Sequence, residues 1–216
     1  MAVLEPRELL VPLIAIALGY AVLRFMLWRA ILTVSPTSLG IEADEPPGRE
    51  KLPDELKGAA AELKQLGFTS IGSHLELPRL GPALTCFDFA REEERTFATL
   101  FLDRDGVPRA YFLSRIAPEG FVISANYRRA ARNEPGRYLS GGLEDVATDR
   151  VYKAHARLLA GLPLQPAADQ EARIAAAREW LSGPGRSEIR QQNLHGLLWT
   201  VGTLGMVAAA ILRRQA

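Results

Sequence analysis

Apolar residues are concentrated at the two ends of the chain, and the interval between them mixes apolar and polar positions. The first apolar run carries no charge from Leu9 to Leu23 and continues to Leu32, interrupted by Arg24 and Arg29. The second run extends from Leu194 to Leu212. A helix needs about 20 apolar residues to cross the hydrocarbon of a bilayer. Both runs therefore predict a transmembrane helix.

A cleavable signal peptide is the competing interpretation of the first run. Glu5 and Glu8 accompany Arg7 before the run, and no small-x-small cleavage site follows it before Pro36. Signal peptides have a basic leading region and such a cleavage site. The sequence therefore favours an uncleaved anchor.

The second run contains Gly202, Gly205 and Ala209, and the last two have the spacing that lets membrane helices approach closely. This spacing predicts helix packing against the first run or against another subunit. The alternative is that glycine and alanine are simply common in such helices.

Two spans would place both termini on one side of the membrane. Arginines near the membrane are more numerous on the side of the central body, which favours a cytoplasmic body by the positive-inside rule. Arg213 and Arg214 oppose this orientation. We therefore expect an integral membrane protein with the domain order 1–34 anchor, 35–53 linker, 54–186 folded domain and 187–216 anchor.

The body begins with a helical pattern near Pro53 or Asp54 and then changes to an extended pattern rich in β-branched and aromatic residues. Short turn-forming breaks separate strands expected at about 68–77, 83–91, 95–102, 108–116 and 121–127. Such short connections join antiparallel neighbours. The pattern predicts a five-stranded antiparallel meander.

A basic, turn-rich segment follows at 128–142, and two helical patterns come after it. The first of these helices has an apolar stripe of Leu143, Ala147, Val151, Ala154 and Leu158. The second follows Pro166 and passes through Ile174, Ala177 and Leu181. The predicted fold class is α+β, with the meander flanked by helices and one transmembrane helix at each end.

The composition of the chain argues against several kinds of function and covalent structure. A formal net charge of +1 gives no basic excess for binding nucleic acid. The single cysteine, Cys86, excludes an intramolecular disulfide and a cysteine-based structural zinc site. Arginine greatly outnumbers lysine, which with the high alanine content is typical of GC-rich bacterial coding.

Few residues have the chemistry of a reactive site. Cys86 with His74 or His155 has the residue types of a nucleophile and a base, but an apolar strand favours a buried, inert thiol at Cys86. His155 borders an apolar helical stripe, which favours a hydrogen-bonded packing role. Three scattered histidines have no metal-site spacing, so we expect neither metal nor cofactor.

His74 alternates with Gly72 and Glu76, which places the three on one face of a strand. His74, Cys86 and Asp88 are the residues that we expect to face a ligand if the sheet binds one.

Four arginines, Arg128, Arg129, Arg132 and Arg137, are opposed locally only by Glu134. They predict contact with anionic lipid headgroups or with an anionic partner. A solvated basic loop is the alternative.

Motifs of serine hydrolases, phosphate loops and dinucleotide sites are absent from the sequence. The first functional hypothesis is a membrane-tethered, non-enzymatic interaction or accessory module with a protein partner or a second copy of the chain. The alternative is a small-ligand or lipid-binding domain, in which a cavity between sheet and helix is lined by Phe87, Phe89, Phe97, Phe101 and Phe112. An enzyme of unknown type is the third hypothesis.

Overall fold

The computed structural model of the chain describes residues 17, 19, 20, 24, 26, 29–31, 33–35, 40–43, 51–77 and 82–215. The chain forms two compact units. One unit is residues 39–185, and the other combines residues 1–38 with residues 186–216.

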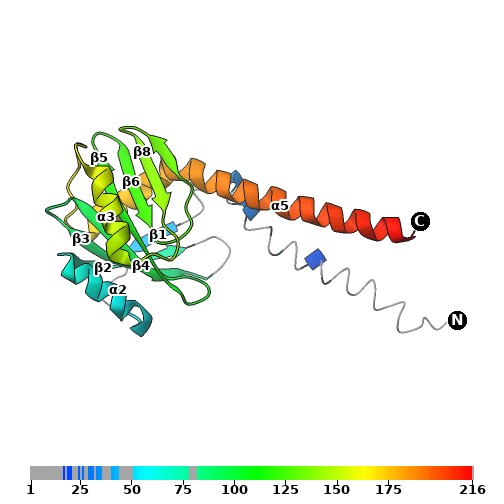
Figure 1. Cartoon of the computed structure of the whole chain (residues 1–216), viewed down its shortest axis with the longest axis horizontal. Helices are drawn as coiled ribbons and strands as arrows, with labels where there is room; N and C mark the ends of the chain where they lie inside the picture. Colours follow the sequence, from blue (N-terminus) through cyan, green and yellow to red (C-terminus); the bar gives the residue numbers. More distant parts are fainter. Residues whose placement is uncertain are drawn as a thin grey trace. The chain divides into compact units, whose positions relative to one another are not determined.

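An eight-stranded mixed sheet forms the centre of the 39–185 unit, with the strand order β1-β2-β3-β4-β5-β6-β8-β7 (Figure 1). All neighbouring strands are antiparallel except β6 and β8, which are parallel. The strands are β1 (Gly40–Ala43), β2 (Thr69–Leu77), β3 (Leu84–Arg91), β4 (Thr96–Leu102), β5 (Pro108–Ile116), β6 (Gly120–Ala125), β7 (Arg132–Glu134) and β8 (Tyr138–Gly142).

The predicted five-stranded antiparallel meander is therefore wrong. Strands β2 to β6 occupy the five predicted intervals, but the sheet continues beyond them at both edges. β1 lies inside the predicted linker, while β7 and β8 lie inside the segment predicted to be turns. β7 has the sequence RNE and β8 the sequence YLSGG, so neither has the apolar alternation that reveals a half-buried strand.

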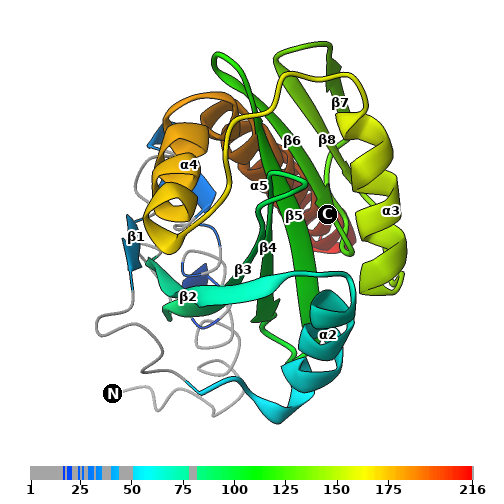
Figure 2. The same ribbon diagram turned by 90° about the vertical axis from the view of Figure 1, so that its left-hand side faces the viewer.

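Helices α2 (Asp54–Gln65) and α3 (Thr148–Leu159) cover one face of the sheet (Figure 2). Their apolar side chains share one buried cluster with Phe87, Phe89 and Phe112 of the strands. The rings of Phe68 and Tyr152 pack edge to face with centroids 5.2 Å apart. This core fixes α2 against strands β3 to β5.

The inward stripe of α3 differs from the predicted one. Val151, Tyr152, His155 and Leu159 are buried. Leu143 precedes the helix, and it and Leu158 are each 43% exposed. His155 is polar, but its two ring nitrogens are both hydrogen-bonded, so it can be buried on the inner side of α3. A prediction from apolar residues alone places its neighbours there instead.

Helix α4 (Gln170–Ser182) covers the opposite face of the sheet (Figure 2). The Asp169 side chain caps it by accepting a hydrogen bond from the backbone N–H of Ala172 at 2.8 Å. Ala176 and the partly buried Trp180 pack against a cluster that includes Phe97 and Leu113.

Gly72 marks an irregularity in β2, where the register with β3 shifts between Ser70 and Gly72. Its φ of +138° is rarely adopted by residues with a side chain. A Cβ built on Gly72 would overlap the side-chain amide of Gln170, whose Nε2 donates to the Ser73 carbonyl. Glycine is therefore required for α4 to begin close to β2.

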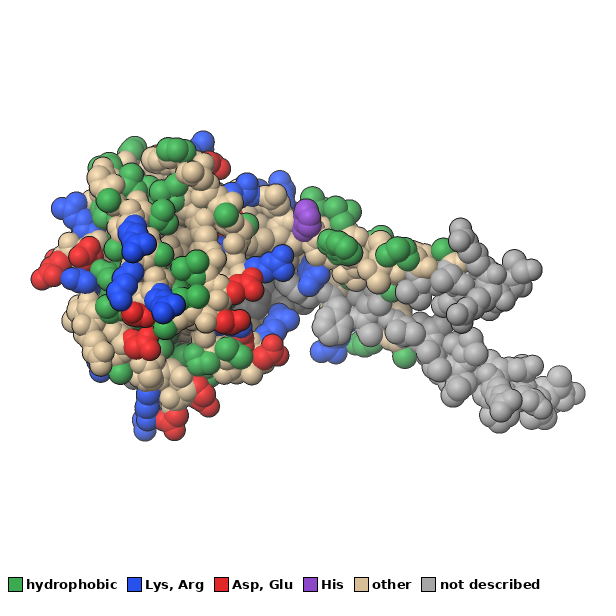
Figure 3. Space-filling model, in the orientation of Figure 1, with side chains coloured by type: hydrophobic (Ala, Val, Ile, Leu, Met, Phe, Trp, Pro, Cys, Tyr) green, Lys and Arg blue, Asp and Glu red, His purple; other side chains and the backbone are tan. Residues whose placement is uncertain are grey.

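In the other unit, α5 (Pro184–Gln215) is the long helix of the C-terminal segment. Arg190 Nε donates to the Thr33 carbonyl oxygen at 2.8 Å. The Arg29 guanidinium lies so close to Gly196 that a Cβ there would overlap its Nη1. Green apolar side chains are visible along the helix in Figure 3, and Leu198, Trp199 and Met206 are more than half exposed.

None of the helices formed by the described residues is both long enough and apolar enough to cross a bilayer. This finding overturns the predicted two-span topology, and with it the membrane localisation and the cytoplasmic placement of the body. The run Leu194–Leu212 lies in α5, whose apolar residues are diluted by Thr200, Gly202, Thr203 and Gly205. Most of the run Leu9–Leu32 lies outside the described residues.

The predicted helix-packing residues Gly202, Gly205 and Ala209 are exposed on α5. A Cβ on Gly202 or Gly205 would meet no described atom within 4 Å. Their packing role stays a prediction.

Candidate functional site

The register of the central strands brings a set of polar residues to the face that α4 covers. His74 lies opposite Cys86, and Gly72 lies opposite Asp88. Asp88 in turn lies opposite Thr99 of β4. Directly paired residues of antiparallel strands point to the same face of a sheet. The three predicted ligand-facing residues, His74, Cys86 and Asp88, therefore lie together.

Asp88 holds the imidazole of His74. Its Oδ2 lies 2.5 Å from Nδ1 of His74, and its Oδ1 accepts a hydrogen bond from Thr99 Oγ1 at 2.7 Å. All three side chains are fully buried. Burial lowers the pKa of His74, but the hydrogen bond with Asp88 and the nearby carboxylate of Glu76 outweigh it, so the pKa lies above its ordinary value.

Arg173 reaches the same carboxylate from α4. Its Nε lies 3.3 Å from Asp88 Oδ1, and its Nε and Nη2 donate to Thr99 Oγ1 at 3.2 and 3.1 Å. Nη2 also donates to the hydroxyl of Tyr111. The Arg173 side chain is 1% exposed. Asp88 thus joins β3 to β2 through its hydrogen bond with His74 and to α4 through its ion pair with Arg173.

The Nε2 side of the His74 ring lies near Glu76, and Cys86 is the cross-strand partner of His74. Nε2 of His74 is buried and has no hydrogen-bond partner among the described residues. Oε1 of Glu76 lies 3.8 Å from it. One ring nitrogen of His74, one carboxylate oxygen of Glu76 and Cys86 Sγ all lie within 4.8 Å of one another. Burial raises the pKa of the Cys86 thiol well above its ordinary value. These three atoms are of the types that bind transition metals.

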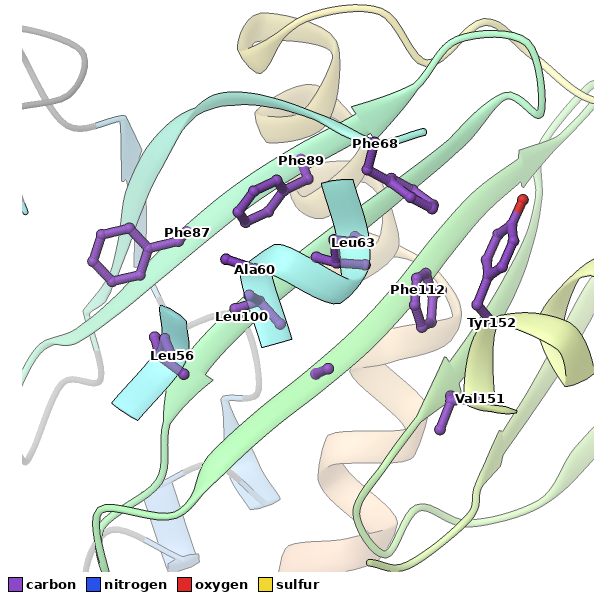
Figure 4. Close-up of a cluster of buried hydrophobic side chains, with 12 residues drawn as sticks. Leu56, Ala60, Leu63, Phe68, Phe87, Phe89, Leu100, Phe112, Val151 and Tyr152 are labelled. Atoms are coloured by element: carbon purple, nitrogen blue, oxygen red, sulfur yellow. The ribbon is translucent and has the colours of Figure 1, made fainter. Parts of the chain in front are cut away.

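A pocket of about 240 Å³ lies on the opposite face, between α2 and strands β2 and β3. Phe87 and Phe89 of β3 both line this pocket, and the ring of Phe89 lies beside Ala60 of α2 (Figure 4). The predicted cavity between sheet and helix is present at this place, and two of the five predicted aromatic residues line it. The lining residues are Leu52, Ala60, Lys64, Ser70, Gly72, Ser73, Phe87 and Phe89.

Two polar groups at this pocket are available to a ligand. The Lys64 ammonium and the Ser70 hydroxyl are exposed and make no side-chain interaction with the described residues. Lys57 on the same helix differs, because its ammonium lies 2.5 Å from Asp54.

His155 forms a separate buried network under α3. Its Nε2 lies 3.1 Å from Ser114 Oγ, and its Nδ1 lies 3.0 Å from Ser124 Oγ. Burial lowers the pKa of His155 to about 3, so the ring is neutral near pH 7. This arrangement fits the predicted packing role. Cys86 points to the other face of the sheet and does not meet His155.

The four predicted contact arginines are dispersed. The Arg129 guanidinium carbon lies 5.1 Å from the ring centroid of Trp180, and its Nη2 donates to the Tyr138 hydroxyl at 3.2 Å. Arg128 is exposed near Glu144. Arg132 lies in β7, and Arg137 directly precedes β8. Their contact with an anionic partner stays a prediction.

Comparison with known proteins gives no match: no family model, no curated protein and no solved structure resembles this chain. Sequence reasoning did not find Arg173, Thr99 and Lys64. An arginine on the inner side of an alanine-rich helix was the available signal for Arg173. Thr99 and Lys64 have no such signal, because their roles depend on tertiary neighbours.

Proposed function

We propose that the 39–185 unit is a non-enzymatic binding domain for a small molecule with an apolar body and one carboxylate. The observation that carries this proposal is the pocket between α2 and the sheet. Phe87, Phe89 and Ala60 offer apolar walls, and Lys64 supplies a cation at its edge that pairs with no described side chain. Apolar walls with few polar groups are the usual design of a small-ligand site.

The volume of the pocket limits the ligand. At roughly 30 Å³ for each water-sized group, 240 Å³ accommodates about eight such groups. Hexanoate has this size and chemistry and serves as a probe. A molecule so small binds with a Kd of about 1 mM if its contacts supply about 4 kcal/mol.

The lining residues support binding rather than catalysis. Lys64 is the one charged side chain among them, and the serine hydroxyls of Ser70 and Ser73 have no histidine beside them in the lining. Acid–base catalysis needs a positioned proton donor or acceptor near the reacting group. The predicted interaction with a protein partner or a second copy of the chain stays a prediction.

Hexanoate titrated into the full-length chain is expected to shift the backbone amide NMR signals of Ser70, Gly72 and Ser73. Replacing Lys64 by glutamine is expected to weaken this binding about three- to fivefold, because an exposed ion pair contributes up to about 1 kcal/mol. Ser70→Phe fills the pocket and is expected to abolish the shifts.

Lys57→Gln is the matched control on the same helix, and it should leave hexanoate affinity unchanged. Hexanamide, which lacks the charge, should bind as weakly to the unaltered chain as hexanoate binds to Lys64→Gln. If hexanoate shifts the amide NMR signals of Ser70→Phe as much as those of the unaltered chain, the proposal is contradicted.

A further inference from the structure

Three potential metal donors converge on the face of the sheet opposite the pocket. His74 and Glu76 come from β2, and Cys86 comes from β3. His74 Nε2 is fully buried without a hydrogen-bond partner among the described residues. A buried donor or acceptor that stays unpaired destabilises the folded chain. A bound ion would supply its missing partner.

We infer that His74, Glu76 and Cys86 form a binding site for one zinc ion, in which Asp88 acts as a positioning residue. Thiolate and imidazole ligands select zinc and similar transition metals, whereas magnesium and calcium prefer sites made only of oxygen atoms. A carboxylate oxygen is a common third zinc ligand. This site goes beyond the proposed function, because it lies on the other face of the sheet.

The distances fit an ion after a small adjustment. Donor atoms around a tetrahedral zinc ion lie roughly 3.3–3.8 Å apart, given bonds of about 2.0–2.3 Å. His74 Nε2 and Glu76 Oε1 are already 3.8 Å apart, and all three donors lie within 4.8 Å. The Glu76 side chain is 25% exposed and is therefore the ligand with room to move.

Asp88 prepares His74 for this role. A carboxylate that accepts a hydrogen bond from Nδ1–H fixes the tautomer and directs the Nε2 lone pair away from itself. The Oδ2 to Nδ1 distance of 2.5 Å provides this contact. Thr99 and Arg173 hold the carboxylate from its other side. The imidazole is thus oriented before any ion arrives.

The charges of the neighbourhood also fit a divalent cation. Metal ligands bind in their deprotonated forms. Glu76, Asp88 and the Cys86 thiolate would then oppose the single positive charge of Arg173, which leaves two negative charges in a region where all but Glu76 are buried. A divalent ion neutralises them, and neutralisation matters because unpaired buried charge is costly.

Zinc titration of the full-length chain, stripped beforehand with a chelator, tests this site. After the excess ion is removed by dialysis, we expect one zinc ion per chain by elemental analysis. Cobalt(II), used in place of zinc, is expected to give thiolate-to-metal charge-transfer absorption, which reports a sulfur ligand directly. Zinc content well below one ion per chain, or cobalt bound without this absorption, would overturn the inference.

Single substitutions distinguish the three metal ligands from the positioning residue Asp88. Glu76→Gln and Cys86→Ser should each weaken zinc binding at least about tenfold, and Cys86→Ser should abolish the cobalt absorption. Asp88→Asn should weaken binding about 10–100-fold and retain the absorption, because the sulfur ligand remains. Glu42→Gln is the matched control. Glu42 lies opposite Leu75 of β2, so its side chain points to the face of the sheet opposite His74 and Glu76.

Equal zinc affinity of Glu76→Gln and Glu42→Gln would also refute the site. If Cys86→Ser does not fold, the cobalt spectrum of the unaltered chain and the Glu76→Gln affinity still decide. Hexanoate binding should be unchanged in Glu76→Gln, so failure of the zinc site and failure of the pocket are distinguishable.

Discussion

Replacing Arg173 by methionine is expected to lower the free energy of unfolding of the 39–185 unit by about 3–5 kcal/mol. Methionine keeps much of the length of the side chain but removes its charge and its donors. Asp88 would lose its guanidinium partner in a fully buried position, and Tyr111 would lose a hydrogen bond. An uncompensated buried charge is among the most destabilising changes in a protein. Urea denaturation followed by circular dichroism measures the loss.

Two further variants test the origin of this loss. Arg157 is exposed on α3, so Arg157→Met should change the free energy of unfolding by no more than about 0.5 kcal/mol. In the double variant Arg173→Met with Asp88→Asn, the buried carboxylate that has lost its arginine partner is gone. The double variant should therefore regain part of the free energy of unfolding. An Arg173→Met variant as stable as Arg157→Met would show that the buried network contributes nothing.

Acidification is expected to destabilise the unit through His155. Its pKa is about 3 in the folded chain, because of burial, against 6.5 as the ordinary value. The folded state therefore opposes protonation of His155. The free energy of unfolding is not reduced by His155 above about pH 6.5, and it falls as the pH decreases towards 3. At about 1.4 kcal/mol per pH unit, the loss over this window is on the order of 4–5 kcal/mol.

His155→Gln isolates this contribution. A glutamine amide can donate and accept hydrogen bonds with Ser114 and Ser124, but it does not titrate. Urea midpoints at several values between pH 7 and pH 4 should fall more steeply for the unaltered chain than for the variant. The two stabilities should thus converge or cross as the pH falls. Identical pH slopes would show that His155 is not protonated on unfolding.

The central part of the fold follows from local patterns. The strands β2 to β6 and the helix α2 lie where alternation and helical periodicity predict them, because their side chains pack on a shared core. The edge strands are different. β1 and β7 are short and contain exposed charges such as Glu42 and Glu134, so only pairing with a neighbouring strand defines them. The parallel pairing of β6 with β8 depends on a crossover that no local pattern encodes.

The polar cluster was partly predictable. Alternation along β2 is enough to place His74 and Glu76 on one face of the strand. The contribution of Cys86 and Asp88 depends on the β2–β3 register, which the hairpin and the irregularity at Gly72 determine. Arg173 depends on the docking of a separate helix. The transmembrane prediction rested on two charge-free runs, but none of the helices formed by the described residues is long and apolar enough to cross a bilayer.

The short outer strands have a consequence for aggregation. β1 has four residues and β7 has three, so each sheet edge offers few free backbone groups to an incoming strand. Two apolar, aromatic-rich segments of high β propensity, LTCFDFAR in β3 and TFATLFL in β4, are paired on both sides in the middle of the sheet. Cross-β growth from the folded domain would therefore require the sheet to open first, and the buried Asp88–Arg173 contact between sheet and α4 opposes that opening.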